Sequence, residues 1–570
     1  MTSALPSRAD VIIVGAGHNS LTAGAYLSRA GLDVLVLEAH ERIGGGSITE
    51  ELTLPGIRHD TFSSGHVWLL TNPLLTRDEL GLAAKGMRYV GHDPVVIMPF
   101  EDGTSLTVWR DPHRTAAEIE QFSTADARAW IAMFEEWSAL APIHLQRVTQ
   151  PARVFPAATD PLEARYRELA AMSAQQVFEE RFESPQLRSL LGWFSFGTAQ
   201  PIDVPGTGLL AASVAVTWSA YGWINAVGGA SALPDALAAA ITEAGGGIVT
   251  DAEVVEILNR DGRATGVRTR DGRTFSATRA VISTANIARL PELMGDAALP
   301  PSFVDGARNW KPGLSLVAVH LVTAGQPAAR AADASIPTVL LAPPASVERL
   351  QRQLDEALAG RASDDIAFLF AGCHTLIDPS RAPDGEGVVK LITFAPYAVD
   401  GDPANWEAQR AHYQRAMLAR YAEWVDGYEP GDELAVTTLT PVDLEARNAS
   451  YYRGAPQGGE MLPHQLGLNR PFAGYAHYRM PVAGLYQTGV TTHPGAPVSG
   501  WPGRHAAAAV LADLGVDVAA FFAEIAAAAD PDGFECPVVE TALLAMAGGH
   551  HIAAGAGRPA HISAGGPRAR

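Results

Sequence analysis

The sequence predicts an α/β protein whose parallel sheet is assembled from stretches that lie far apart in the chain. Three observations predict this fold class. A strand, a glycine turn, a helix and a second strand follow one another near the start of the chain. A glycine turn, an alanine-rich helix and two Asp-Gly hairpin signals follow Gly222, and a last strand, Gly484 to Thr488, leads through a glycine and proline loop to a helix near Pro502. Strands that alternate with helices in this way are typical of parallel sheets.

The first of these stretches has the order strand, turn, helix, strand and acid. Asp10 to Val14 (DVIIV) is an apolar run of buried-strand type, Asn19 to Ala30 has helical apolar spacing, and Asp33 to Leu37 (DVLVL) is a second apolar run. Glu38 follows, 23 residues after Gly15. Dinucleotide-binding folds place at this spacing the acid that hydrogen-bonds a ribose.

The turn after the first strand has the glycine pattern of a nucleotide-binding loop, with one change. Gly15 permits the sharp turn, Gly17 lets the backbone approach a pyrophosphate, and the helix N-terminus offers free N–H groups and a partial positive charge. Ser20 stands where the third glycine is expected, and Gly24 supplies another position for close packing of helix on strand. A βαβ unit without a ligand is the alternative, but the acid Glu38 favours dinucleotide binding.

A long, mostly helical region follows a second glycine-rich loop, Arg42 to Ser47. The helical region runs from about Thr76 to Ala220 and is rich in tryptophan and phenylalanine. At helical spacing these rings are expected in the core, and together they could also wall an apolar pocket. They are Trp130, Phe134, Trp137, Phe178, Trp193, Phe194 and Phe196.

The middle and the end of the chain add one further glycine turn and few chemical motifs. Val227 to Ala230 (VGGA) precedes the alanine-rich helix, and the Asp-Gly pairs at residues 261–262 and 271–272 predict a small antiparallel meander before a strand at Ala280 to Thr284. Residues 285–469 mix strands and helices, with distinctive but unassigned segments at 440–448 and 451–471. The last 20 or so residues are of low complexity, and we expect them to be mobile.

The composition describes a globular enzyme and excludes several partners. Hydrophobic residues make up 47% of the 570 residues and charged residues 18%, and the net charge is −20. Such a charge argues against nucleic acid and against simple electrostatic attachment to anionic lipid. Cys373 and Cys536 show no metal-ligand spacing, and His550 and His551 lie in the low-complexity tail, so no metal site is predicted. No secretion signal is recognised and the longest apolar run, Gly208 to Trp218, predicts a buried helix, so a cytoplasmic location is expected.

With these segments in place, the sequence resembles the FAD-dependent phytoene desaturase-like oxidoreductases of the amine oxidase and GDP-dissociation-inhibitor superfamily. The resemblance covers roughly residues 8–515. It is carried by VIIVGAGHNSLTAGAYL, LEAHERIGGGS, GIRHDTFSSG, the VGGASALPDALA segment with its meander, and the ending GLYQTGV to HPGAPVSGWPGRHAA. It implies a Rossmann-like FAD-binding domain of the GR2 type and a discontinuous, mixed α+β substrate-binding domain.

The resemblance also divides the chain into segments and assigns site residues. The FAD-binding domain would comprise residues 1–75, 222–290 and 475–520, the substrate-binding domain residues 76–221 and 291–474, and a C-terminal extension residues 521–570. Glu38 would bind the adenosine ribose, the Arg42 to Ser47 loop would support the pyrophosphate, and the Val254 backbone would meet the adenine. The loop from Gly489 to Gly503 would lie along the isoalloxazine. The expected cofactor-binding residues are Gly15, Gly17, His18, Asn19, Ser20, Glu38, Ala39, Arg42, Gly45, Gly46, Ser47, Val254, Gly489, Gly500, Trp501 and Gly503.

The chain departs from the resembling families at a few positions. His40 stands where many relatives carry arginine, and Gly46 where amine oxidases often have arginine, so the pyrophosphate contacts would rely more on backbone groups. Amine oxidases place a lysine near the flavin N5 atom, and of the three lysines here Lys311 is nearest to that position by its sequence context. A side chain at Gly500 or Gly503 is expected to enter the space where flavin and backbone meet.

The implied function is the dehydrogenation of an apolar, isoprenoid-like small molecule by hydride transfer to flavin N5. No second dinucleotide motif is present for a nicotinamide, so oxygen or a quinone is the expected electron acceptor. An amine oxidase or flavin-dependent isomerase, and a non-enzymatic lipid-binding or chaperone protein, stay open as alternatives. A peripheral membrane contact is compatible with an apolar substrate, and no oligomeric state is predicted. His493, between the last strand and the helix, is either the catalytic base or a brace for the loop.

Overall fold

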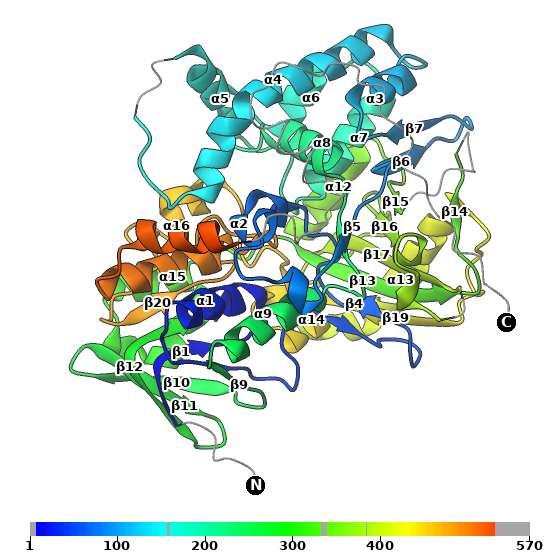
Figure 1. The fold of residues 1–570 in the computed structure, drawn as a ribbon. Helices are drawn as coiled ribbons and strands as arrows, with labels where there is room; N and C mark the ends of the chain where they lie inside the picture. The colour runs from blue at the N-terminus through cyan, green and yellow to red at the C-terminus, as the bar shows by residue number, and fades with distance from the viewer. Residues whose placement is uncertain (1–6, 157–159, 332–338, 384, 530–570) are drawn as a thin grey trace, which may run out of the picture.

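Two seven-stranded sheets organise the part of the chain that the computed structural model describes, residues 7–156, 160–331, 339–383 and 385–529 (Figure 1). The first sheet has the strand order β10-β11-β12-β1-β2-β9, with β20 beside β12. Its strands are β1 (Arg8–Val14), β2 (Val34–Leu37), β9 (Gly247–Val249), β10 (Val254–Arg260), β11 (Arg263–Thr269), β12 (Thr274–Ser283) and β20 (Leu485–Gln487). The sheet thus joins strands from the three separate stretches that the sequence singles out.

The pairing in the first sheet follows the sequence patterns closely. β1 pairs in parallel with β2 and with β12, and β2 pairs in parallel with β9. β10, β11 and β12 form the expected antiparallel meander, in which Asp261 and Gly262 take positive φ values of 52° and 76° at the first hairpin. Positive φ at both central residues is what a tight hairpin turn requires. The strand expected at 280–284 is the second half of β12 rather than a separate element.

Helices cover both faces of this sheet. Val11 and Ile13 of β1 pack under α1 (His18–Arg29), α9 (Ala232–Glu243) and α15 (Trp501–Asp513). Ile12 points to the other face, towards α10 (Leu290–Met294) and α11 (Pro301–Arg308). α16 (Val518–Ala528) lies beside α15, where the ring of Phe522 is 3.7 Å from the Arg504 guanidinium (Figure 1). Because α1 begins next to the turn at Gly15 and Gly17, its N-terminus faces the edge where the parallel strands end.

The second sheet has the order β19-β13-β17-β16-β15-β6-β7 and is mostly antiparallel. Its strands are β6 (Val96–Pro99), β7 (Ser105–Val108), β13 (Ser315–Thr323), β15 (Leu340–Leu341), β16 (Phe370–Cys373), β17 (Gly387–Ala395) and β19 (Ala435–Leu439). Every residue of β13 is buried, because helices and loops cover both faces of the sheet. One of these helices is α13 (Trp406–Ala422), which packs on the face opposite the cavity described below.

A layer of helices lies over the second sheet and forms the upper part of the molecule in Figure 1. All seven aromatic residues expected in the core of this region are buried, which confirms that expectation. The apolar run Gly208 to Trp218 lies mostly within one of these helices, as expected, and no described helix has the length and apolar character needed to cross a membrane. The layer comprises α3 (Pro112–Ile119), α4 (Thr124–Thr149), α5 (Pro161–Ala171), α6 (Ala174–Arg181), α7 (Pro185–Phe196), α8 (Leu210–Tyr221) and α12 (Val347–Leu358).

Short elements complete the fold. They are α2 (Pro73–Thr76), α14 (Pro441–Arg447), β3 (Thr49–Glu50), β4 (His59–Asp60), β5 (Tyr89–Val90), β8 (Asn225–Ala226), β14 (Ala328–Ala329) and β18 (Val425–Asp426). Cys373 is buried and free, whereas Cys536, His550, His551 and the low-complexity tail lie outside the described residues.

Candidate active site

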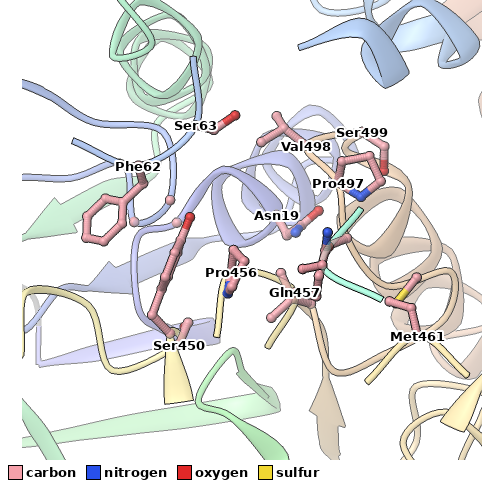
Figure 2. A pocket seen from close by; sticks show the side chains of 18 of the residues that line it. Asn19, Phe62, Ser63, Ser450, Pro456, Gln457, Met461, Pro497, Val498 and Ser499 are labelled. Atoms are coloured by element: carbon pink, nitrogen blue, oxygen red, sulfur yellow. The ribbon is translucent and has the colours of Figure 1, made fainter. Parts of the chain in front are cut away.

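A cavity of about 1940 Å³ lies between the two sheets. Figure 2 shows that four segments far apart in the sequence face this space. They are the start of α1 with Asn19, the loop after β4 with Phe62 and Ser63, the chain after α14 with Ser450, Pro456 and Gln457, and the loop before α15 with Pro497, Val498 and Ser499. The fold therefore brings both predicted helix N-termini and the unassigned segment 451–471 to one site.

One end of the cavity is the glycine turn together with Glu38. Glu38 is buried, and its Oε2 atom accepts a hydrogen bond from the Ala16 N–H at 2.7 Å. Its Oε1 atom accepts one from the His40 N–H at 3.0 Å. Each carboxylate oxygen keeps a lone pair for a further donor, so the side chain both fastens the turn and can accept from hydroxyl groups.

The two glycine loops form a cradle of backbone. A Cβ atom on Gly45 would lie 2.9 Å from the Cα atom of Gly17, whereas one on Gly46 would meet only the Tyr451 ring at 3.5 Å. The Ser63 N–H donates to the Gly46 carbonyl oxygen at 3.0 Å and so joins the loop after β4 to the same cradle. Because these glycines carry no side chain, a bound group could lie directly against the backbone beside Gly17.

Unsatisfied polar atoms surround this cradle. The buried atoms Asn19 Oδ1, Ser47 Oγ and Ser64 Oγ have no hydrogen-bond partner among the described residues. The first turn of α1 carries no side-chain cap, so its backbone N–H groups are free as well. Buried polar groups are normally paired, and free donors at a helix N-terminus suit a phosphate. The residues present thus fit a dinucleotide whose diphosphate lies at the start of α1.

The replacement of the third glycine by Ser20 has a local explanation. Its hydroxyl donates to Thr284 Oγ1 at 3.1 Å, and that threonine donates to the Val14 carbonyl oxygen at 2.7 Å. The serine therefore links α1 to the ends of β1 and β12. Close packing of helix on strand occurs at Gly24, where a Cβ atom would lie 3.3 Å from Ile13 Cδ1 of β1.

Comparison with known proteins decides which dinucleotide fits the cradle. The model of the family described as flavin-containing amine oxidoreductases matches residues 21–511. The chain belongs to this family. It is an FAD-dependent oxidoreductase with the FAD-binding fold of the amine oxidases, and the residues of the cradle are those that would hold the cofactor.

Individual relatives are similar over almost the whole chain. One of the polypeptides of the limonene dehydrogenase of Castellaniella defragrans is 28% identical over 539 residues, which covers 89% of this chain and 95% of that protein. The lycopene-forming phytoene desaturase of Pseudescherichia vulneris is 26% identical and covers 89% and 99%. Among solved structures, putrescine oxidase with bound putrescine has a TM-score of 0.58 at 16% identity and covers 89% of this chain and 99% of that one. At this identity the structural likeness concerns the fold.

Most of the residues expected to bind the cofactor of this flavoprotein line the cavity. They are Gly15, Gly17, His18, Asn19, Ser20, Glu38, Ala39, Arg42, Gly45, Gly46, Val254, Gly489 and Trp501. Ser47, Gly500 and Gly503 do not appear in the cavity wall, although the Ser47 hydroxyl is one of the unpaired atoms beside the cradle.

Gly500 and Gly503 make close contacts within the protein itself. A Cβ atom on Gly503 would lie 2.2 Å from the Asn19 carbonyl oxygen, so this glycine lets α15 pack against α1. Gly500 has φ +70°, and a Cβ atom there would meet Asn72 and Leu74 at 3.2 Å. Both glycines therefore shape the site through helix packing and backbone conformation.

His493 lines the cavity, and its contacts are those of a brace. Its Nε2 atom lies 3.0 Å from the Gln150 carbonyl oxygen at the end of α4, so the ring donates there, and its Nδ1 atom has no partner among the described residues. Burial lowers the pKa of His493 to about 4. The ring is thus neutral at pH 7 and is a weak base there.

Lys311, the lysine expected near the flavin N5 atom, does not lie at the cavity. Lys311 is exposed and outside the cavity wall, and its backbone N–H donates to Gln465 Oε1 at 2.8 Å. Lys390 on β17 lines the cavity instead and is buried. Sequence context favoured Lys311 because it precedes an apolar strand, whereas only the pairing of β17 with β13 and β16 brings Lys390 to the site.

A buried ion cluster fixes the loop after β4. Arg381 is fully buried, and its guanidinium bonds to Asp60 Oδ2 at 2.8 Å and to Asp378 Oδ2 at 3.1 Å. Burial by itself would raise the pKa of Asp60, but Arg381 and other neighbours outweigh it and hold the pKa at about 2. The Ala230 and Gly228 N–H groups donate to the same two carboxylates, so the VGGA turn, the loop after β4 and the second sheet are held together here.

A further buried guanidinium holds the chain on the far side of the cavity. Arg470 is fully buried and donates to the carbonyl oxygens of Gln457, Glu460, Gln465 and Val490. Burial lowers the pKa of Arg470 to about 9. The segment 457–465 thereby keeps its place beside Gly489 and Val490. Beyond the distinctive composition of residues 451–471, no sequence signal points to this role of Arg470.

The end of the cavity away from Glu38 is walled by aromatic rings. The Trp193 and Phe370 rings are nearly parallel, 7° apart in orientation with centroids at 6.0 Å. Trp218 and Trp223 have ring centroids 4.5 Å apart and also line the space. Further apolar lining comes from Phe194, Leu209, Leu210, Val214, Leu316, Phe368, Ile392 and Phe394. Two of the aromatic residues expected in the core, Trp193 and Phe194, thus also form a pocket wall.

Proposed function

We propose that this flavoenzyme dehydrogenates an apolar, isoprenoid-like small molecule that binds between the aromatic wall and the flavin. The observation that carries the proposal is the composition of that wall, which is built from tryptophan, phenylalanine and aliphatic side chains. Burial of apolar substrate surface against such rings is favourable by about 25 cal/mol per Å². The names of two relatives, a limonene dehydrogenase and a phytoene desaturase, support an apolar substrate class.

Bound FAD supplies a hydride acceptor for an activated C–H bond. The protein's own contribution is to hold the substrate, to exclude water and to keep the loop of residues 489–499 in place through His493 and Arg470. The electrons leave to oxygen or to a quinone, since the sequence has no second dinucleotide motif. We further propose a cytoplasmic location with contact to a membrane surface from which an apolar substrate is taken.

An amine substrate is less well matched to this cavity. Lys390 lies in the aromatic part of the wall, and its positive charge would repel a substrate ammonium group. Glu38, Glu41, Glu253 and Glu292 line the cavity with Val254 and Arg42 at the end expected to hold adenosine. Glu50 and Glu445 also line the cavity, and they are paired with Arg447 and Arg289.

Anaerobic mixing of the flavin-loaded protein with substrate tests the proposal. We expect limonene or a longer isoprenoid hydrocarbon to bleach the flavin absorbance and to yield a product lacking two hydrogens, and cyclohexylamine to leave the flavin oxidised. Bleaching by the amine with release of an imine would favour the amine oxidase alternative. A substrate whose double bond moves without net loss of hydrogen would favour the isomerase.

A variant of the aromatic wall gives a second test. Trp218→Leu removes a ring that contacts Trp193 and Trp223, and we expect KM for the hydrocarbon to rise about tenfold with normal flavin content, because the lost contact area is apolar. Trp130→Leu is the matched control, since Trp130 is buried in α4 outside the cavity. It should lower the melting temperature and leave KM unchanged. Equal KM effects for both variants would show that the wall does not bind substrate.

A further inference from the structure

Lys390 is a cation set into the apolar wall of the cavity. Alternate residues of β17, namely Lys390, Ile392 and Phe394, line the cavity, because side chains two residues apart share one face of a strand. Lys390 is 2% exposed, and no carboxylate of the described residues lies within ion-pair distance of its Nζ atom. A buried ammonium without a carboxylate partner is costly unless other groups accept its hydrogen bonds.

Two of the three ammonium hydrogens have acceptors. Lys390 Nζ donates to the Asp60 carbonyl oxygen at 2.9 Å and to the Phe62 carbonyl oxygen. Asp60 is the last residue of β4 and Phe62 belongs to the loop that follows, and Phe62 itself lines the cavity. An ammonium group has three donors, so one hydrogen is left without an acceptor among the described residues.

A second donor in the same wall is also unsatisfied. The indole Nε1 atom of Trp223 is buried and has no partner among the described residues, and Trp223 lines the cavity. Its ring centroid is 5.5 Å from that of Phe370 on β16, the strand that pairs with β17 through Gly372 and Lys390. Two unpaired donors in one apolar wall call for an acceptor on the molecule that fills the cavity.

We propose that the substrate of this enzyme carries an oxygen acceptor, a carbonyl or carboxylate group, on its otherwise apolar skeleton, and that the Lys390 ammonium donates to that oxygen. This inference rests on the proposed function, since it names the polar group of the same substrate. It assigns Lys390 as a specificity-determining residue. The hydrogen bond would orient the skeleton along the aromatic wall, with the oxygen next to the Phe62 backbone.

The charge of Lys390 depends on pH. Burial lowers the pKa of Lys390 to about 8, so the ammonium loses its proton as the pH rises through that value. The groups that face it from neighbouring elements are Asp60, Arg381, His59, His320 and His374. Burial lowers the pKa of His59 to about 4, that of His374 to about 3 and that of His320 well below its ordinary value, while the pKa of Asp60 is held at about 2. None of these four titrates between pH 6.5 and 9.

Calorimetric binding to the flavin-loaded protein tests the proposal with three probes that share one skeleton. The probes are isopropylbenzene, 4-isopropylacetophenone and 4-isopropylbenzoate, measured at pH 6.5 and pH 9. We expect the ketone or the carboxylate to bind at least about tenfold more tightly than the hydrocarbon at pH 6.5, as a hydrogen bond to a charged donor allows. A preference for the carboxylate that fades at pH 9 identifies an acid, and a preference for the ketone identifies a neutral carbonyl.

Substitutions of Lys390 and Lys311 distinguish substrate recognition by Lys390 from the hydrogen bonds that Lys390 makes to Asp60 and Phe62. Lys390→Met should keep its flavin and its affinity for isopropylbenzene within twofold and lose the preference for the oxygenated probe. Lys390→Arg, which stays charged, should keep a preference at both pH values. Lys311→Met is the matched control, since Lys311 is exposed and outside the cavity.

Three results would overturn the proposal: no preference in the wild-type protein, a preference that survives in Lys390→Met, or a Lys311→Met variant that loses it. Because binding is measured without turnover, the proposal can be judged even if none of the probes is oxidised. Failure of hydrocarbons to reduce the flavin would count against the proposed function and not against the role of Lys390.

Discussion

The backbones of Gly17 and Gly45 are in contact, so that a Cβ atom on Gly45 would lie 2.9 Å from the Cα atom of Gly17. The contact joins the turn after β1 to the second glycine loop, and the cradle that would hold the FAD diphosphate lies beside it.

Gly45→Ala should therefore lose FAD. Gly45 has φ +58°, and the added methyl group would push the two loops apart. Gly262→Ala is the matched control, because Gly262 has φ +76° but no atom within 4 Å of an added Cβ. Both variants should lose about 1 kcal/mol of stability from backbone strain, and only Gly45→Ala should lose flavin. The ratio of flavin to protein absorbance after gel filtration measures this, and equal flavin content in the two variants would contradict the cradle.

Glu38→Ala should give soluble protein with much less flavin. The carboxylate accepts from the Ala16 and His40 N–H groups, and we expect it to accept from the ribose hydroxyls as well. Hydrogen bonds to charged groups contribute about 1.5–3 kcal/mol each, so FAD affinity should fall at least about tenfold. Glu51→Gln, at an exposed position outside the cavity wall, serves as control. Reconstitution of the flavin-free protein gives the dissociation constant, and an unchanged value for Glu38→Ala would exclude the assignment.

His493→Gln distinguishes the two roles left open for this residue. A glutamine can still donate to the Gln150 carbonyl oxygen, so a brace would be kept and a base would be lost. Because the pKa of His493 is about 4, we expect the brace. Anaerobic flavin reduction by substrate should then stay within about threefold of wild type. A fall of 100-fold or more with normal FAD binding would identify His493 as the base, since general base catalysis contributes about 10²–10⁴-fold.

The buried histidines should make the protein sensitive to acid. Burial lowers the pKa of His66 and of His144 from 6.5 to about 4. A group with a depressed pKa in the folded state contributes stability above its unfolded pKa, and that contribution is lost as the pH falls from 6.5 towards 4. At pH 5 the loss is about 2 kcal/mol for each such histidine.

We therefore expect a melting temperature that changes little between pH 7 and pH 8 and is lower by several degrees at pH 5, measured on the flavin-loaded protein. His320→Phe should reduce the fall, because both ring nitrogens of His320 are buried without partners among the described residues. His113→Gln, at an exposed position, should not change it. A melting temperature that is equal at pH 5 and pH 7 would contradict this account.

Local patterns in the sequence were enough to predict the elements at the end of the site that is expected to hold adenosine. The apolar runs at 10–14 and 33–37 and the helix between them form β1, β2 and α1 within a residue or two. The Asp-Gly pairs mark the two hairpins of the meander. These predictions succeed because strand and helix periodicity and turn chemistry are properties of neighbouring residues. The spacing between Gly15 and Glu38 is equally local, since a single βαβ unit fixes it.

The catalytic end of the site could not be predicted in the same way. The chain from 448 to 457 lies along the cavity, yet it contains no motif that a single sequence reveals. The packing role of Gly503 could not be predicted, because its contact with the Asn19 carbonyl oxygen joins two helices that are far apart in the sequence.

The sequence by itself determined the βαβ unit, the glycine loops and the dinucleotide cradle, because each depends on residues close together in the chain. Only the tertiary structure decided which lysine lines the cavity. Lys311 precedes an apolar strand and Lys390 lies within one. The register of β17 between β13 and β16 turns Lys390 into the cavity, while Lys311 stays at the surface. Strand register is set by pairing between distant segments, and a shift of one residue would turn Lys390 to the opposite face of the sheet.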